Sequence, residues 1–263
     1  MMSEKMLKKI TVAKSAKGKR EDSADLVAVE RPLTLFVNDF ELVTMICSPD
    51  AYLELAVGFL ISEGMIGSFS DIQNYICQEE EGLIRFALKM EPEKRKESFL
   101  RRNLASCCGR GSANFYFIND AREMKPLENS PEVVLLKQIE LLHEMEEAAE
   151  IFRKTGGVHN AALAGDSLIV RFEDIGRHNA VDKIIGYSCL HRISLQDKSL
   201  LLSGRISSEM VIKAARAGIP AIISRAAATD LAITMAEELN ILLAGFVREG
   251  KATIYTQFSR VIM

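Results

Sequence analysis

Two adjacent cysteines in a glycine-rich loop with an arginine are the residues best suited to chemistry, in the segment Cys107-Cys108-Gly109-Arg110-Gly111. A cysteine reacts as the thiolate, and a free cysteine with a pKa of about 8.5 is only a few per cent ionised near neutral pH. Loop amides and a neighbouring guanidinium would raise that fraction. Consecutive Cα atoms lie about 3.8 Å apart, whereas an unstrained disulfide needs roughly 4.4–6.8 Å. The pair therefore predicts a working thiol rather than a structural disulfide.

Three further polar clusters stand where predicted strands and helices meet, at residues 155–162, 173–183 and 203–209. The first is a glycine turn that would present His159, although a helix C-cap with a structural histidine explains it as well. The second precedes a helix N-terminus, where Arg177 or His178 could help to hold a phosphate; His178 could also carry a proton, and an internal salt-bridge network is the alternative. The third has the composition of an anion-holding loop, although a helix N-cap explains most of it.

A fourth element, residues 246–251, links two predicted strands and carries two cations around a glycine turn. A simple hairpin is the default interpretation. It becomes a phosphate or guanine clamp only if it faces the other clusters.

Three common kinds of site are disfavoured by the motifs. The cysteines and histidines lack the spacing of a structural zinc site, and Ala161 stands where a deaminase needs its glutamate, so we expect no intrinsic metal. A Walker A loop is missing, as is a G-x-G-x-x-G turn after a strand. ATP hydrolysis and dinucleotide-dependent hydride transfer are therefore not favoured.

The composition is typical of a globular protein, with 48% hydrophobic and 26% charged residues in a chain of 263. A net charge of −3, no tryptophan and only 6% aromatic residues argue against nucleic acid as a partner. No stretch approaches the ~20 apolar residues of a membrane span, so we expect no membrane association. The five cysteines form no disulfide framework, and we expect a reducing, cytoplasmic location.

We expect three parts along the chain. Seven lysines and arginines stand against one acid in the first twenty residues, which predicts a disordered basic tail over residues 1–24. Residues 25–100 alternate short strands with one helix, which predicts a small α+β unit. The polar stretch at 91–98 at its end is predicted to be a solvated linker. Alternatively, this stretch is a mobile basic segment that docks an anion or a protein. Residues 101–263 alternate strands and helices and predict an α/β domain that also carries the cysteine loop. Within it, one helix is predicted from about residue 130 to Phe152.

The chain resembles the formate dehydrogenase accessory sulfurtransferase family (FdhD) from about residue 25 to residue 258. The resemblance rests on motifs in the same order at residues 155–162, 173–183, 203–220 and 245–248. It implies an α/β fold, α+β overall, with a cytidine deaminase-like three-layer C-terminal domain and a smaller N-terminal α+β unit, in a cytoplasmic homodimer. It also implies a sulfurtransferase that takes sulfur from a cysteine desulfurase as a persulfide. The acceptor is the molybdenum (or tungsten) bis-molybdopterin guanine dinucleotide cofactor, which formate dehydrogenase needs in sulfurated form.

Carried onto this sequence, the resemblance assigns the persulfide to Cys108. The guanine-dinucleotide loop falls on Phe246, Val247, Arg248, Glu249, Gly250 and Lys251. The sequence departs from the frequent Cys-Gly-x-Cys-Gly form, since Gly111 occupies the second cysteine position and Cys107 lies beside the first. Two other functions stay open: a non-catalytic chaperone that holds the cofactor or a guanine nucleotide without moving sulfur, and a metal-dependent nucleoside hydrolase.

Overall fold

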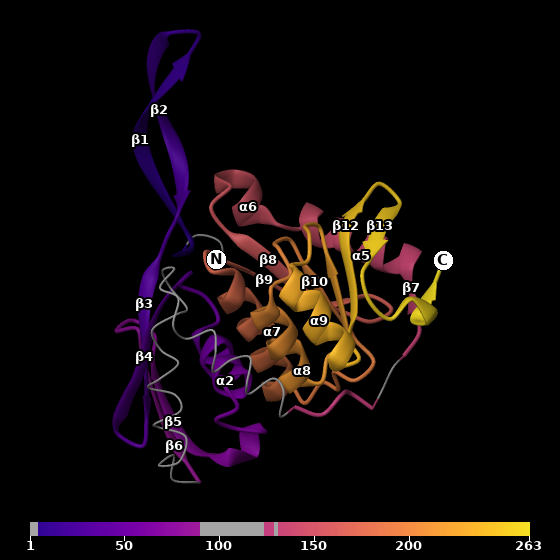
Figure 1. The fold of residues 1–263 in the computed structure, drawn as a ribbon. Coiled ribbons are helices and arrows are strands. Elements are labelled where there is room, and N and C mark those ends of the chain that lie inside the picture. The colour runs from indigo at the N-terminus through magenta and orange to yellow at the C-terminus, as the bar shows by residue number, and fades with distance from the viewer. Residues whose placement is uncertain (1–4, 90–123, 129–130) are drawn as a thin grey trace.

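A six-stranded sheet covered by helices on both faces forms the centre of the protein (Figure 1). The computed structural model describes residues 5–89, 124–128 and 131–263. The cysteine loop, the predicted linker at 91–98 and the predicted boundary between residues 100 and 101 lie outside these residues. Within them, no helix is long and apolar enough to cross a bilayer.

The strands of this sheet lie in the order β13-β12-β11-β10-β8-β9. The three strands β10, β11 and β12 are parallel, and the other pairings are antiparallel. Their bounds are β8 (His159–Ala164), β9 (Leu168–Asp174), β10 (Ser199–Leu202), β11 (Ala221–Ser224), β12 (Leu242–Arg248) and β13 (Lys251–Ile254). The helices are α5 (Leu135–Glu147), α6 (Glu150–Thr155), α7 (Arg177–Leu190), α8 (Ser208–Ala217) and α9 (Asp230–Glu238).

Side chains that alternate along each strand divide the interior into two cores. Leu163 and Leu200 belong to the core that holds the apolar faces of α7, α8 and α9. Their chain neighbours Ala162 and Leu201 belong to the core beneath α5. Successive residues of a strand point to opposite faces, so one sheet needs a helical layer on each side. The predicted three-layer α/β architecture is confirmed.

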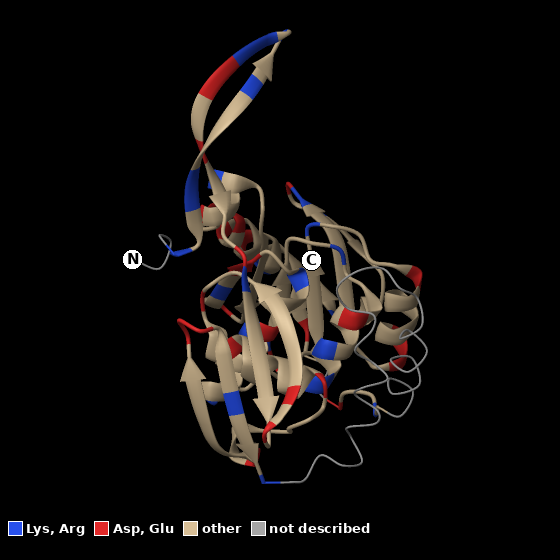
Figure 2. Ribbon diagram, turned by 90° about the vertical axis from the view of Figure 1, so that its left-hand side faces the viewer, with Lys and Arg blue, Asp and Glu red and all other residues tan. Residues whose placement is uncertain are grey.

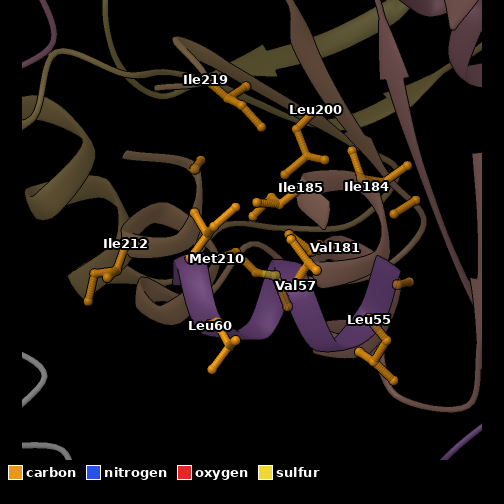
Figure 3. Packing of buried hydrophobic residues seen from close by; sticks show 14 of the residues in the cluster. Leu55, Val57, Leu60, Val181, Ile184, Ile185, Leu200, Met210, Ile212 and Ile219 are labelled. Carbon is orange, nitrogen blue, oxygen red and sulfur yellow. The ribbon is translucent and has the colours of Figure 1, made fainter. Parts of the chain in front are cut away.

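The N-terminal unit is a second sheet with one helix, as predicted. The sheet has the order β4-β3-β6-β5, built from β3 (Arg31–Val37), β4 (Phe40–Cys47), β5 (Ile72–Gln78) and β6 (Leu83–Leu88), with a short 3₁₀ helix η1 (Phe69–Asp71) before β5. Helix α2 (Tyr52–Ser62) connects β4 to η1 and packs along α7. Figure 3 shows Val57 of α2 close to Val181 of α7, whereas Leu55 and Leu60 extend from the opposite side of α2. One hydrophobic core therefore continues from this unit into the central domain.

The α2–α7 crossing is close because each helix carries a glycine at the contact. A Cβ atom at Gly58 would lie 1.7 Å from the carbonyl oxygen of Asp182, and one at Gly186 would lie 1.8 Å from that of Glu54. Side chains at these positions would force the helices apart.

We expect Gly186→Ala to lower the free energy of unfolding by about 1–3 kcal/mol, because the added methyl group overpacks the crossing. The comparison variant is Gly67→Ala, whose Cβ would meet only the carboxylate of Asp71 at 3.7 Å. Urea unfolding midpoints measure both changes. Equal midpoints for the two variants would contradict the close contact.

The prediction of a disordered tail over residues 1–24 is wrong for the residues described. Strands β1 (Leu7–Ala16) and β2 (Lys19–Ala28) form a ten-pair antiparallel hairpin. Lys17 and Gly18, with φ of 51° and 77°, form its turn, and Lys14 pairs with Asp25 across the strands at 3.0 Å. Two consecutive residues with positive φ are typical of the tight turns that suit hairpins. Lysine density predicted disorder, whereas the Lys-Gly turn and the alternation of Ile10 and Val12 with polar residues favoured strands.

The single helix predicted up to Phe152 is two helices preceded by a short strand, β7 (Val133–Val134). The chain leaves helical geometry at Ala149, with ψ of 81°. The carboxylate of Glu173 then accepts hydrogen bonds from the backbone N–H groups of Ile151 and Phe152. A buried carboxylate on β9 thus satisfies the free N-terminus of α6, which no local pattern could predict. Beyond β13, η2 (Phe258–Arg260) leads to β14 (Val261–Ile262), which pairs with β7.

Candidate functional site

All four polar segments predicted from the sequence gather at one edge of the central sheet. The parallel strands β10, β11 and β12 end there, followed by Ser203, Arg225 and the 246–251 loop. Strand β8 runs the opposite way, so His159 begins it at this edge and pairs with Asp174, the last residue of β9. Figure 1 shows the tip of the β12–β13 hairpin and helix α6 both at the top of the central sheet. Carboxyl ends of parallel strands are the usual position of a site in such a sheet.

A pocket of about 630 Å³ opens at this edge. Its walls come from the end of α5, from α6 and the glycine turn after it, and from the starts of β8 and of the segments after β10 and β11. The lining residues are Glu146, Ala149, Phe152, Arg153, Gly156, Gly157, Val158, His159, Asn160, Ile175, Ser203 and Arg225. The first cluster therefore supplies five of the twelve lining residues, and the second and third supply one residue each.

His159 stands in this wall as a neutral imidazole near pH 7. Partial burial and the neighbouring Arg177 guanidinium lower its pKa below the usual 6.5. The missing side chain of Gly204 leaves room for the ring, since a Cβ there would lie 3.3 Å from Nδ1 of His159. A neutral imidazole can both accept and donate a hydrogen bond.

Asn160 connects the elements of the pocket wall through two hydrogen bonds. Its side-chain Nδ2 donates to the carbonyl oxygen of Met145 on α5 at 3.0 Å, and its backbone N–H donates to the hydroxyl of Ser203 at 2.9 Å. The side chain is buried. Asn160 and Ser203 therefore fix β8 against α5 and β10, which gives them a structural part in the site.

Arg225 connects the pocket with the 246–251 loop, and the sequence analysis did not single it out. Its Nε lies 3.3 Å from a carboxylate oxygen of Glu146, and its Nη1 donates to the carbonyl oxygen of Val247 at 3.0 Å. A usable signal was present, because Arg225 directly follows β11 as Ser203 directly follows β10. The pair Ser224-Arg225 was missed because it lacks the glycine that marks each of the other clusters.

The 246–251 loop presents an aromatic ring from a strained backbone. Phe246 has φ of 52° and an exposed side chain, and the β12–β13 register shifts between Gly245 and Arg248. A Cβ at Gly245 would lie 2.7 Å from the carbonyl oxygen of Ala226, so only glycine lets the strand come this close. A bulky residue with positive φ costs about 1–3 kcal/mol and is concentrated at functional sites.

The remaining residues of the loop form its turn, are buried in the core or are exposed to solvent. Glu249 and Gly250, with φ of 46° and 76°, make the tight turn, and Val247 is buried. Arg248 and Lys251 form a cross-strand pair, and both side chains are exposed. An exposed ring and two exposed cations therefore belong to one hairpin, which Arg225 contacts at the carbonyl group of Val247.

Most charged residues of the second cluster, 173–183, belong to an internal salt-bridge network. This network was the alternative to a phosphate-binding site in the interpretation of the sequence. The Nζ of Lys183 lies 2.7 Å from a carboxylate oxygen of Asp174, and neither side chain is exposed. Asp182 pairs with Lys213 at 2.7 Å and accepts a hydrogen bond from Ser62 at 2.6 Å. These groups join the central domain to the N-terminal unit and are not free to bind a ligand.

Arg177 and His178 of that cluster lie near enough to His159 to lower its pKa, although neither lines the pocket. An imidazole nitrogen of His178 lies 2.5 Å from the carboxylate of Glu209 on α8. This contact holds the pKa of Glu209 below its ordinary value. In the third cluster, Ser207 occupies the N-cap position of α8, but its hydroxyl makes no capping hydrogen bond.

The three cysteines in the described part of the chain lie in environments that disfavour the thiolate. Burial raises the pKa of Cys47 to about 12 and also raises the pKa values of Cys77 and Cys189. Such thiols are scarcely ionised at neutral pH. Cys107 and Cys108 lie outside the described residues. Within the ranges that are described, no group of three or more His, Cys, Asp or Glu side chains gathers as a metal site.

Comparison with known proteins gives a consistent result. The FdhD/NarQ family profile matches residues 28–262. The sulfur carrier protein FdhD of Bacillus licheniformis is 42% identical over 245 residues, 93% of each chain, and that of Bacillus pumilus is 41% identical over 261 residues, 99% of each chain. A crystal structure of a candidate formate dehydrogenase accessory protein from Desulfotalea psychrophila shares the fold. It matches with a TM-score of 0.80 at 24% identity and covers 98% of this chain and 100% of its own.

Proposed function

Since the chain belongs to the FdhD/NarQ family, we propose that it is a sulfurtransferase that carries sulfur as a persulfide on Cys108. The donor is a cysteine desulfurase. The substrate that receives the sulfur is the molybdenum bis-molybdopterin guanine dinucleotide cofactor, and the client is formate dehydrogenase. Relatives at about 40% identity bear the name sulfur carrier protein FdhD, which supports a sulfur-carrying role.

The observation that carries the proposal is the set of cysteine environments. A persulfide forms when a thiolate attacks a sulfane sulfur, so the carrier must be ionised and accessible. Cys47, Cys77 and Cys189 fail this requirement because burial raises their pKa values. The pair at 107 and 108 remains, with glycines and Arg110 beside it. Incubation with a desulfurase and cysteine should therefore load about one cyanide-labile sulfur on each chain.

The 246–251 loop supports the acceptor half of the proposal. A guanine base has a flat face that stacks on an exposed aromatic ring, and Phe246 offers one. The diphosphate of the cofactor needs cations, which Arg248 and Lys251 supply beside that ring. The bulge and Arg225 hold the ring in place before the ligand arrives, which lowers the entropy cost of binding.

Arg248→Gln combined with Lys251→Gln should weaken binding of GDP, a fragment of the cofactor, by about ten-fold or more, which corresponds to about 1.4 kcal/mol. Removal of both cations leaves the phosphates without charge-assisted hydrogen bonds. Sulfur loading should stay at the wild-type level, because the loop takes no part in that step. Isothermal titration with GDP measures the affinity.

The matched control is Lys137→Gln with Arg192→Gln, which removes two cations from other parts of the surface. This control should bind GDP as the wild type does. Unchanged GDP affinity in the loop variant, or equal losses in both variants, would count against the loop as the guanine-dinucleotide site.

We place this chemistry in a reducing cytoplasm, where thiols stay free, and we expect a homodimer. Both follow from the cysteine pattern and the family resemblance.

A further inference from the structure

The hairpin β1–β2 projects from the body as an arm, defined here as residues 5–28 (Figure 1). Among the described residues its two strands pair only with each other. Every residue from 13 to 22 is exposed. A two-stranded hairpin is marginally stable alone in water, so an ordered arm of this length suggests a surface that serves a partner.

The arm differs from the rest of the molecule in charge. Residues 5–28 hold seven lysines and arginines against three acids, a net charge of +4. The whole chain carries −3, so the residues outside the arm together carry −7. Figure 2 shows the blue segments of lysine and arginine along the projecting strands. Two of the three acids, Asp22 and Asp25, pair within the hairpin with Arg20 and Lys14. The cations without a described ion pair are Lys5, Lys8, Lys9, Lys17 and Lys19.

The root of the arm lies against the candidate site. Met6 is buried together with Ile151 of α6 and Val158, and Val158 also lines the pocket. Ala28, the last residue of β2, lies close to Gly157. A Cβ atom added at Gly157 would lie 3.4 Å from the Cβ atom of Ala28. A protein held by the arm would therefore stand beside the edge that carries the pocket.

Two simpler explanations of the lysines leave observations unexplained. Lysines on edge strands prevent strand-to-strand aggregation, but this does not explain why the fold builds the arm at all. A nucleic-acid arm would interleave aromatic side chains for stacking, and residues 5–28 contain none.

We infer that the arm is the docking element for an acidic surface on the protein that donates sulfur. This inference rests on the proposed function, because a persulfide passes directly between two proteins whose cysteines must meet. In that step the Cys108 thiolate attacks the outer sulfur of the donor's cysteine persulfide. A new S–S bond forms on Cys108, the donor's S–S bond breaks, and the donor cysteine leaves as its thiolate, so no external oxidant or reductant is needed. The arm raises the rate of encounter through its positive field.

The test compares two sulfur sources. The arm variant carries Lys9→Glu, Lys17→Glu and Lys19→Glu, and the matched control carries Lys89→Glu, Lys137→Glu and Arg192→Glu on other parts of the surface. With a desulfurase and cysteine at about 50 mM salt, loading of the arm variant should be about ten-fold slower than wild type. The difference should shrink at about 500 mM salt, where charges are screened. With inorganic polysulfide, which needs no docking, all three proteins should load at equal rates.

A second variant guards against a folding effect of the charge reversals. It replaces residues 12–23 by Asn-Gly, so that the paired root from Leu7 to Thr11 and from Ala24 to Ala28 is kept. It should show the same selective loss with the desulfurase.

Four results would overturn the inference. Wild-type rates from the desulfurase in both arm variants would show that the arm takes no part in docking. Equally slow sulfur loading in the matched control would show that the effect comes from the net charge of the protein and not from the arm. A dimeric wild type with a monomeric arm variant would assign the arm to a second copy of the chain. If wild type takes no sulfur from polysulfide either, the proposed function itself fails, and the docking inference fails with it.

Discussion

Cys108→Ala should abolish the cyanide-labile sulfur that the wild-type chain acquires from a desulfurase and cysteine. We expect the loss to be complete because the family resemblance assigns the persulfide to Cys108, and because burial disfavours the thiolate of Cys47, Cys77 and Cys189. Cys47, the extreme case, is fully buried and has its pKa raised to about 12. At pH 7 its thiolate fraction is on the order of 10⁻⁵, against a few per cent for an ordinary thiol.

Two variants serve as controls for this loss. Cys189→Ser removes a half-buried thiol of raised pKa and should keep full loading. Cys107→Ala should keep most of the loading, because a strained neighbouring disulfide is not needed for a persulfide to form. Full loading of Cys108→Ala would instead identify the chain as a binding module without transferase activity.

Lys183→Met should lower the free energy of unfolding by about 3–5 kcal/mol, because it leaves a fully buried carboxylate without its counter-charge. Asp174 would keep hydrogen bonds from the N–H groups of Ser48 and Gly176 but lose the ammonium group 2.7 Å away. Chemical denaturation measures the change. The same network joins β4 to β9, so we expect the N-terminal unit to loosen together with the site edge.

The matched control for this prediction is Lys198→Met, since Lys198 pairs with the exposed Asp197. Surface pairs contribute about 0–1 kcal/mol, so this variant should unfold near the wild-type midpoint. A second variant, Lys183→Met with Asp174→Leu, removes both charges and should recover part of the loss. A loss below about 1 kcal/mol for Lys183→Met alone would contradict the structural role given to the pair.

Most strands and helices could be predicted because their side-chain pattern is local. The sequence predicts strands at Phe40–Cys47, Ile72–Glu79 and Leu83–Leu88, and the observed β4, β5 and β6 agree with these bounds to within one residue. The three-layer order of the central domain follows from strand–helix alternation. The position of three polar clusters at junctions between strands and helices was also expected, whereas the sequence left open whether residues 246–251 face them.

The features that the sequence could not reveal depend on contacts distant along the chain. The break between α5 and α6 depends on Glu173, a residue of β9. The position of Arg225 depends on its hydrogen bond to the carbonyl group of Val247. The positive φ of Phe246 depends on a bulge that packs against Ala226. Pairing of this kind is set by tertiary structure and leaves no periodic signal.

The second cluster shows why composition alone misleads about sites. Three acids, an arginine, a histidine and a lysine around a helix N-terminus were consistent with a phosphate site, yet Asp174 and Lys183 neutralise each other inside the fold. Charged residues that are buried must be paired, so a dense polar motif marks an internal network as readily as a ligand site. The histidine of the first cluster, by contrast, lines a pocket.

Mass spectrometry of the sulfur-loaded protein tests the central claim most directly. Trypsin cuts after Arg102 and Arg110, which releases residues 103–110 with both neighbouring cysteines in one peptide. The account predicts a gain of about 32 Da on this peptide, and fragmentation should place it on Cys108 rather than on Cys107. A loaded protein whose added sulfur lies on Cys47, Cys77 or Cys189, or which gains no mass at all, would contradict the account.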